Sequence, residues 1–211
     1  MIYRKFDKLD IKTSLLGFGC MRFPTLKDGK IDETKAEQMI DLAIKNGVNY
    51  IDTAYPYHNG DSEPFLGKIL NKYPRNSYFL ATKLPIWAIE NKDDVYRIFD
   101  EQLQRLETEY IDFYFAKVKE LGIIEICEEF RKEGKIKYLG FSFHDSYEVF
   151  DEILNHYHWD FCQIQFNYMD TEIQAGLKGY ELAKAKDIPL IVMEPIKGGL
   201  LAKLPKEISM M

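Results

Sequence analysis

Three residues of this chain have side chains that could together perform acid chemistry: Asp52, Tyr57 and Lys83. Asp52 and Lys83 each end an apolar stretch, and charges in such places are costly to bury unless they pair. Tyr57 follows Asp52 by five residues and can reach back over the same region. An ammonium beside a phenol stabilises the phenolate and lowers the phenol pKa from about 10. We therefore expect Tyr57 to give a proton to a developing alkoxide, as carbonyl reduction requires.

Other polar residues and glycines also lie in or just after apolar stretches. Ser142 ends KIKYLGFS, Gln163 lies within DFCQIQF, and Gly198 and Gly199 follow VMEPIK. Each has a simpler interpretation. Ser142 could cap a helix, Gln163 could be a satisfied core amide, and the two glycines could form an ordinary turn. The pair of Asp52 and Lys83 could likewise be a structural ion pair alone.

The elements that would position these residues alternate between the strand and the helix period. After a hairpin over 3–12, the predicted strands are Leu15–Met21, 48–53, Ser77–Lys83, 110–115, 135–142, 160–166 and Pro189–Pro195. Predicted helices follow all but the last, over 32–47, 62–73, 93–106, 123–134, 146–154 and 171–186.

Strict alternation of strands and helices predicts an α/β fold with a parallel sheet. The fingerprint G-x-G-x-x-G is absent after the first strand, which favours a barrel over an open doubly wound sheet. We predict one domain over residues 1–211, a (β/α)8 TIM barrel that is incomplete here and truncated at its C-terminus. Catalytic groups of such barrels lie at the carboxyl ends of the strands, where the three residues fall.

Composition excludes several functional classes. The 211 residues are 46% hydrophobic with a net charge of −6, which opposes binding to nucleic acid or an anionic membrane. No apolar run approaches the roughly 20 residues that a membrane helix needs. The first ten residues contain no apolar signal-peptide segment, so a cytoplasmic location is expected. Cys20, Cys127 and Cys162 are too far apart for a C-x-x-C pair and are expected to be reduced thiols. His156 and His158 are expected on the face opposite the site, and no metal is expected there.

The sequence resembles the aldo-keto reductases, which are NAD(P)H-dependent (β/α)8 enzymes. The matching stretches, in the family's order, are LGFGCMRFP, NYIDTAYPYHNGDSE, ATKLP, EGKIKYLGFSFH, CQIQFNYMD and VMEPIKGGLL. The resemblance implies that Asp52, Tyr57 and Lys83 are three of four catalytic residues, with Tyr57 as the acid. It also implies cofactor-binding roles for Gly19, Met21, Ser142, Gln163, Met193, Gly198 and Gly199. Ser142 and Gln163 would hold the nicotinamide carboxamide, and the final two glycines would approach the pyrophosphate.

The sequence departs from the family at three places. Lys117 stands where the family has the fourth catalytic residue, a histidine, and Phe143 stands where many relatives have asparagine. An eighth βα unit is also missing. We expect that a loop after the fourth strand is omitted from the sequence rather than deleted, and both interpretations stay open for the eighth unit. The resemblance implies NADP(H) in preference to NAD(H). It implies an iron–sulfur cluster only if a further C-terminal domain exists, as in some bacterial relatives.

Two other functions remain open at this stage. The chain could bind a nicotinamide cofactor with little turnover, as a redox sensor or subunit, because the histidine is absent. It could also be an unrelated barrel lyase or isomerase that uses Lys83 as a Schiff-base nucleophile. His58 could contact substrate or partly replace the missing histidine. The expected partner is a small carbonyl substrate, and the oligomeric state is not predicted.

Overall fold

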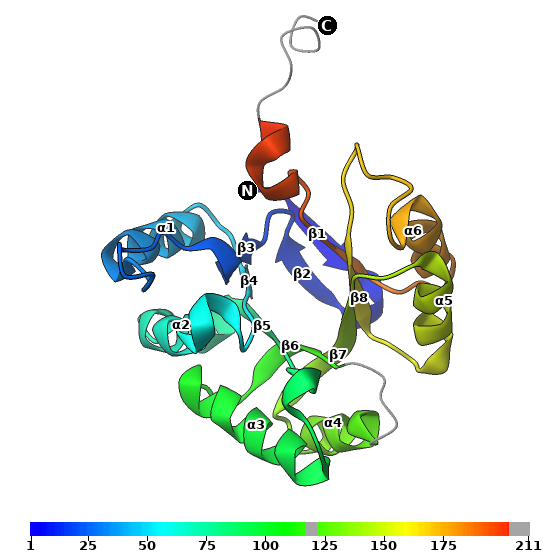
Figure 1. Cartoon of the computed structure of the whole chain (residues 1–211), viewed down its shortest axis with the longest axis horizontal. Coiled ribbons are helices and arrows are strands. Elements are labelled where there is room, and N and C mark those ends of the chain that lie inside the picture. Colours follow the sequence, from blue (N-terminus) through cyan, green and yellow to red (C-terminus); the bar gives the residue numbers. More distant parts are fainter. Residues whose placement is uncertain (117–121, 203–211) are drawn as a thin grey trace, which may run out of the picture. The chain divides into compact units, whose positions relative to one another are not determined.

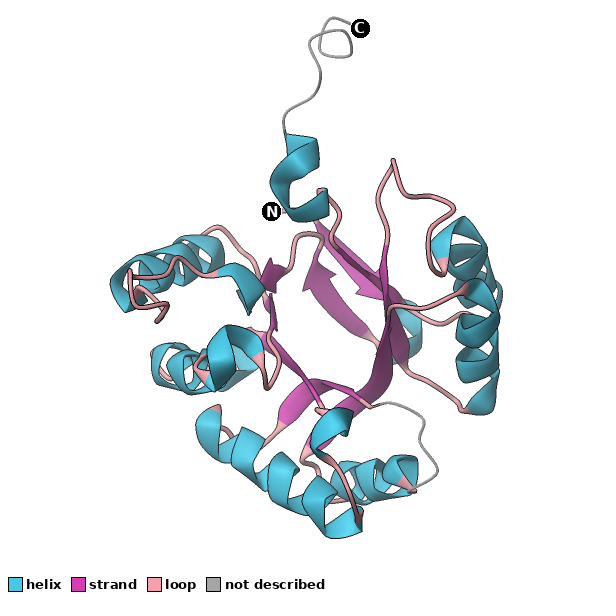
Figure 2. Ribbon diagram, in the orientation of Figure 1, coloured by secondary structure: helices cyan, strands magenta, loops and turns pink. Residues whose placement is uncertain are grey.

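The computed structural model describes residues 1–116 and 122–202, which fall into two compact units, Met1–Gly140 and Phe141–Met211. The position of Lys117 therefore lies outside the described residues. In both units strands alternate with helices, as Figure 2 shows. The prediction that residues 1–211 make one barrel domain stays a prediction.

The first unit contains a hairpin and a parallel sheet (Figure 1). In the hairpin, β1 (Tyr3–Phe6) pairs antiparallel with β2 (Ile11–Ser14). The parallel strands neighbour one another in chain order and are β3 (Phe18–Gly19), β4 (Tyr50–Asp52), β5 (Phe79–Lys83), β6 (Ile111–Phe115) and β7 (Ile136–Phe143). The helices between them are α1 (Glu33–Lys45), α2 (Ser62–Leu70), α3 (Lys92–Arg105) and α4 (Ile123–Lys132).

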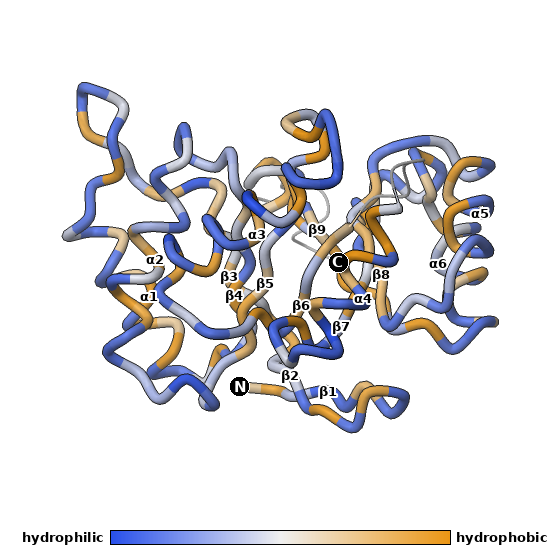
Figure 3. Tube along the Cα trace, turned by 90° about the horizontal axis from the view of Figure 1, so that it is seen from below, coloured by the Kyte–Doolittle hydropathy of each residue, from blue (hydrophilic) through white to orange (hydrophobic). Residues whose placement is uncertain are grey.

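The second unit begins within β7, at Phe141, and repeats the same pattern. Its elements are α5 (Tyr147–His156), β8 (Phe161–Gln165), α6 (Gly176–Ala185), β9 (Leu190–Met193) and a short helix over Lys197–Ala202. The two strands pair in parallel, with Gln163 opposite Ile191 and Gln165 opposite Met193. The hydropathy of the α5 trace alternates along its turns in Figure 3 because the helix buries one face, including Phe150 and Leu154.

Burial explains why these segments become parallel strands. All five residues of β6 and all five of β8 are buried, as expected for strands covered on both faces. Aromatic rings fill the space between sheet and helices. Phe99 of α3 stacks on Phe130 of α4 with ring centroids 4.0 Å apart, and Trp159 lies 5.0 Å from Phe141.

Several predicted boundaries differ from the structure. The first strand is only Phe18–Gly19, because it pairs with the short β4, and the chain then turns into a 3₁₀ helix at Cys20. The third helix starts at Lys92, where Asn91 and Asp94 form a capping box. The last begins at Gly176 rather than Thr171. The N-cap at Asp32 is confirmed, since its side chain accepts a bond from the Lys35 N–H.

Two further observations concern the described residues as a whole. Among them, no helix is both long and apolar enough to span a lipid bilayer, and no cluster of acidic, histidine or cysteine side chains is arranged to bind a metal ion. Cys20, Cys127 and Cys162 are buried free thiols, which confirms the prediction for the cysteines.

Candidate active site

The predicted ion pair of Asp52 and Lys83 is present. Asp52 ends β4 and Lys83 ends β5, and the two strands are parallel neighbours. Their side chains therefore meet at the carboxyl end of the sheet. The Lys83 Nζ donates to Asp52 Oδ1 at 2.6 Å and to the carbonyl oxygen of Thr53 at 2.9 Å. The side chains of Asp52 and Lys83 are 14% and 18% exposed, so this pair is largely shielded from water.

Tyr57 lies beside this pair. The Lys83 Nζ is 5.3 Å from the centroid of the Tyr57 ring. The chain reaches this arrangement through a tight turn in which His58 and Asn59 adopt left-handed backbone conformations, with φ of 53° and 57°. Such values are uncommon outside glycine, so the turn is fixed by its surroundings. The structure thus brings the three predicted catalytic residues together within one unit.

The predicted direction of the Tyr57 pKa was wrong. Burial of the phenol raises its pKa above the ordinary value, and the Lys83 ammonium offsets only part of this increase. Desolvation disfavours the phenolate more strongly than one neighbouring cation favours it. Tyr57 therefore keeps its proton at neutral pH, as a proton donor must.

The pKa of Lys83 is also raised, but by its neighbours rather than by burial. Burial acts to lower its pKa, but the charge of Asp52 and contacts with Tyr57 outweigh burial, so the pKa lies above the ordinary value. A lysine held as an ammonium is a poor nucleophile, because only the neutral amine can form a Schiff base. This argues against the lyase or isomerase alternative.

The His58 side chain contacts Phe23, a residue of the same unit. Its Nε2 accepts a hydrogen bond from the Phe23 backbone N–H at 3.1 Å, and the two rings lie 5.6 Å apart. A ring nitrogen that accepts cannot donate at the same time, so only Nδ1 remains as a proton source in this arrangement. A role in place of the missing histidine stays a prediction.

The predicted cofactor residues Gly19 and Met21 belong to the first unit. Gly19 pairs with Asp52 across the ladder, next to the ion pair, and a Cβ there would meet no atom within 4 Å. Met21 is 55% exposed. Gly19 therefore leaves room for a ligand near Asp52.

The remaining predicted cofactor residues belong to the second unit. The Ser142 hydroxyl donates to Gln163 Oε1 at 3.1 Å and lies 3.8 Å from the Met193 sulfur. Ser142 lies within β7, so it is not a helix cap. Gly198 and Gly199 both have positive φ, 66° and 100°, which explains glycine at these positions.

This donor set fits a nicotinamide. A hydroxyl and a primary amide supply both donors and acceptors, which a carboxamide requires. Next to them, Gln165 is 5% exposed, and its Oε1 is buried without a hydrogen-bond partner among the described residues. A buried acceptor of this kind is costly unless a donor satisfies it. These residues are therefore suited to hold a polar, amide-bearing group.

Sequence reasoning missed two polar clusters. In the second unit, Asp170 accepts from Lys197 Nζ at 2.7 Å and from Asn167 Nδ2 at 3.0 Å. In the first, Gln102 donates to the buried carboxylate of Glu63 and accepts from the Tyr114 hydroxyl. A helical glutamine with no motif around it gives no signal in the sequence. Glu63 lies at the start of α2, inside the matching stretch NYIDTAYPYHNGDSE, which carries no mark of its buried contacts.

A family model and several known proteins are similar to this chain in sequence. A family model described as the Aldo/keto reductase family matches residues 15–209. A soybean (Glycine max) protein named probable aldo-keto reductase 1 is 33% identical over 151 residues, covering 65% of this chain and 44% of its own length. The uncharacterized oxidoreductase YqkF of Bacillus subtilis is 30% identical over 216 residues, covering 96% of this chain and 67% of its own length. The chain thus spans about half to two thirds of these curated relatives.

A solved structure extends the similarity to three dimensions. The holo form of the aldo-keto reductase AKR11C1 from Bacillus halodurans is 30% identical with a TM-score of 0.78. The match covers 98% of this chain and 71% of that chain. This likeness confirms the predicted fold class, an α/β fold of the TIM-barrel type, with seven parallel strands among the residues that the structure describes.

Proposed function

Because this chain belongs to the aldo/keto reductase family, we propose that it is an NAD(P)H-dependent oxidoreductase that reduces an aldehyde or ketone to the alcohol. Family membership implies nicotinamide-dependent carbonyl chemistry in general. The assignment of Tyr57 as proton donor, tuned by Lys83 and Asp52, is part of the proposal. The observation that carries it is the buried ion pair between Lys83 and Asp52, 2.6 Å long, with the Tyr57 ring beside the ammonium.

The side chains support a division of roles. Tyr57, kept protonated by burial, would donate its proton to the carbonyl oxygen as negative charge develops there. The Lys83 ammonium would stabilise the phenolate that remains, and Asp52 would keep the ammonium charged and oriented. These groups are fixed before reaction, so little reorganisation is needed.

Binding of the cofactor is assigned to the second set of residues. Ser142 and Gln163 would hold the carboxamide of the nicotinamide, Met193 would pack against its ring, and the backbone at Gly198 and Gly199 would approach the pyrophosphate. Gly19 and Met21 would line the space next to Asp52. When bound, the reduced nicotinamide supplies the hydride. NADP(H) is proposed in preference to NAD(H), and an iron–sulfur cluster only with a further C-terminal domain.

Stopped-flow spectroscopy tests the proposal. Purified protein saturated with NADPH or NADH is mixed with a reactive aromatic aldehyde, and loss of the dihydronicotinamide absorbance is followed. We expect oxidation that depends on the aldehyde, and a decrease of at least about 100-fold in kcat for Tyr57→Phe with nearly unchanged cofactor affinity. Cofactor binding without any aldehyde-dependent oxidation would instead support a binding protein with little turnover.

A further inference from the structure

The carboxylate of Glu63 is fully buried although it is not one of the three proposed catalytic residues. Its Oε1 accepts from Thr82 Oγ1 at 2.7 Å and from Gln102 Nε2 at 2.8 Å, and Arg105 lies 3.4 Å from its Oε2. Burial of a carboxylate is unfavourable unless hydrogen bonds and a counter-charge compensate. A residue kept in such a costly position needs a structural or functional reason.

Gln102 connects this carboxylate to Lys83. Its Nε2 donates to the Lys83 carbonyl oxygen at 3.1 Å, and its Oε1 accepts from the Tyr114 hydroxyl at 2.8 Å. The Lys83 carbonyl and the Glu63 carboxylate can only accept, so the amide nitrogen must face them. Glu63 and Tyr114 thus fix the orientation of the amide, and the amide fixes the backbone of Lys83.

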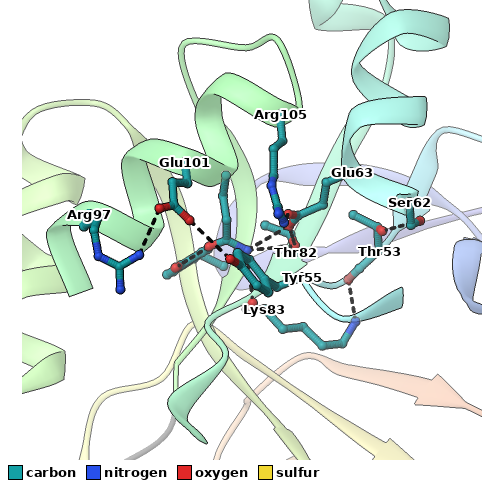
Figure 4. Close-up of polar contacts among 11 residues, drawn as sticks. Thr53, Tyr55, Ser62, Glu63, Thr82, Lys83, Arg97, Glu101 and Arg105 are labelled. Carbon is teal, nitrogen blue, oxygen red and sulfur yellow. Dashed lines mark hydrogen bonds and ion pairs between the residues drawn. The ribbon is translucent and has the colours of Figure 1, made fainter. Parts of the chain in front are cut away.

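The same turn of α2 also reaches the other side of the ion pair. Ser62, which precedes Glu63, lies with its Oγ 2.9 Å from Thr53 Oγ1, and the Thr53 carbonyl accepts from the Lys83 ammonium. Figure 4 shows Ser62 and Glu63 beside Thr53 and Thr82, the residues adjacent to the ion pair in the two strands. Lys83 is therefore held at both ends, by Gln102 at its backbone and by Asp52 and Thr53 at its ammonium.

We propose that Glu63, Gln102 and Tyr114 form a positioning network for Lys83. Glu63 orients the Gln102 amide, which fixes the end of β5 so that the Lys83 ammonium stays between Asp52 and the Tyr57 ring. None of the three touches the reacting atoms, so they act through Lys83. The kinetic part of this inference rests on the proposed function, whereas its structural part does not.

The first experiment measures Lys83 without any substrate. The protein is reductively methylated with formaldehyde and a borane reductant, and the rate at Lys83 relative to exposed Lys68 is followed by peptide mass spectrometry. Gln102→Met preserves side-chain length but removes both donors, so Lys83 loses its backbone restraint. We expect the relative rate at Lys83 to rise at least about threefold, in keeping with the loss of one buried hydrogen bond.

Matched variants separate positioning from general loss of stability. Glu101→Gln changes a carboxylate in the same helix that bonds Tyr55 and Arg97 but not the network, and should leave the relative rate unchanged. Glu63→Gln keeps an oxygen that can accept from Gln102 and should stay close to wild type. If Gln102→Met does not fold, Tyr114→Phe, which only deletes the hydroxyl, should change the rate in the same direction.

The second experiment is kinetic. For Gln102→Met we expect kcat to fall at least about tenfold and the alkaline limb of its pH profile to shift, with the cofactor dissociation constant within about twofold of wild type. Unchanged Lys83 labelling in folded Gln102→Met and Tyr114→Phe would overturn the inference. Absence of reductase activity in the wild-type protein would instead overturn the proposed function, and the labelling result would still decide this inference.

Discussion

The Lys83 ammonium donates a 2.6 Å hydrogen bond to Asp52 across two neighbouring parallel strands. Both charges are largely removed from water, so each depends on the other. This pair determines that Lys83 remains charged beside Tyr57. Because the pairing is direct, each partner can be tested by a single substitution.

Asp52→Asn should weaken the proposed reaction through Lys83. The neutral amide removes the charge that raises the pKa of Lys83, so burial then acts against the ammonium. We expect kcat to fall by about 10-fold to 100-fold, measured by steady-state oxidation of the cofactor over a range of pH. Glu33→Gln, which disrupts an exposed ion pair with Lys68, is the control and should keep kcat. Wild-type turnover by Asp52→Asn would argue against the assigned role.

Ser142→Ala tests the proposed cofactor contact. The change removes the hydroxyl that donates to Gln163 and that we place beside the nicotinamide. We expect the dissociation constant of the reduced cofactor to rise about fivefold to tenfold, measured by quenching of protein fluorescence. Ser146→Ala is the matched control, because that side chain makes no cap hydrogen bond to the following helix. An equal affinity for Ser142→Ala and the control would remove Ser142 from the site.

Because of the ion pair between Asp170 and Lys197, the free energy of unfolding should decrease at acid pH. Hydrogen bonding from Lys197 is the largest of several effects that lower the pKa of Asp170. A carboxyl with a lowered folded-state pKa contributes stability above its unfolded pKa, about 3.9, and loses it as the pH falls through the folded value. We expect the urea midpoint of wild type to fall more steeply below about pH 4 than that of Asp170→Asn. Parallel pH profiles for the two proteins would contradict this account.

Asp112→Asn should destabilise the first unit. Asp112 is 1% exposed and accepts from Arg75 at 2.7 Å, from Lys137 at 3.0 Å and from the Leu80 N–H at 3.0 Å. The N–H groups of an asparagine amide would face the groups that now donate to the Asp112 carboxylate. Arg75 and Lys137 would also lose their negative counter-charge. The free energy of unfolding should fall by about 3 kcal/mol in urea denaturation. A change below about 0.5 kcal/mol, the size expected for an ordinary surface substitution, would show that the cluster is not stabilising.

Gly67→Ala should disturb the contact between α2 and α3. A Cβ at Gly67 would clash with the Arg105 carbonyl oxygen and lie 2.8 Å from the Leu106 carbonyl carbon, and both are backbone atoms that cannot rotate away. We expect a loss of about 2 kcal/mol or more in the free energy of unfolding. Gly19→Ala, where the Cβ meets nothing within 4 Å, is the control for stability. Equal stability of the two variants would show that the helices separate without cost.

The amino-acid sequence alone determined the alternation of strands and helices and the identity of the candidate catalytic residues. Period and length of apolar stretches are local properties, and strand ends follow from them. Asp52, Tyr57 and Lys83 could thus be predicted from spacing, together with a resemblance of six ordered motifs. The resemblance alone assigned Ser142 and Gln163 a shared role; the two side chains are hydrogen-bonded to each other, and the role stays a prediction.

Only the tertiary structure determined the properties that depend on contacts between segments far apart in the sequence. Gln102 reaches the Lys83 carbonyl only because α3 packs over β5, and no local pattern marks a glutamine for that contact. The direction of the Tyr57 pKa shift depends on how completely the surrounding chain excludes water from the phenol. Burial is a sum over many non-neighbouring contacts, so spacing along the chain does not encode it.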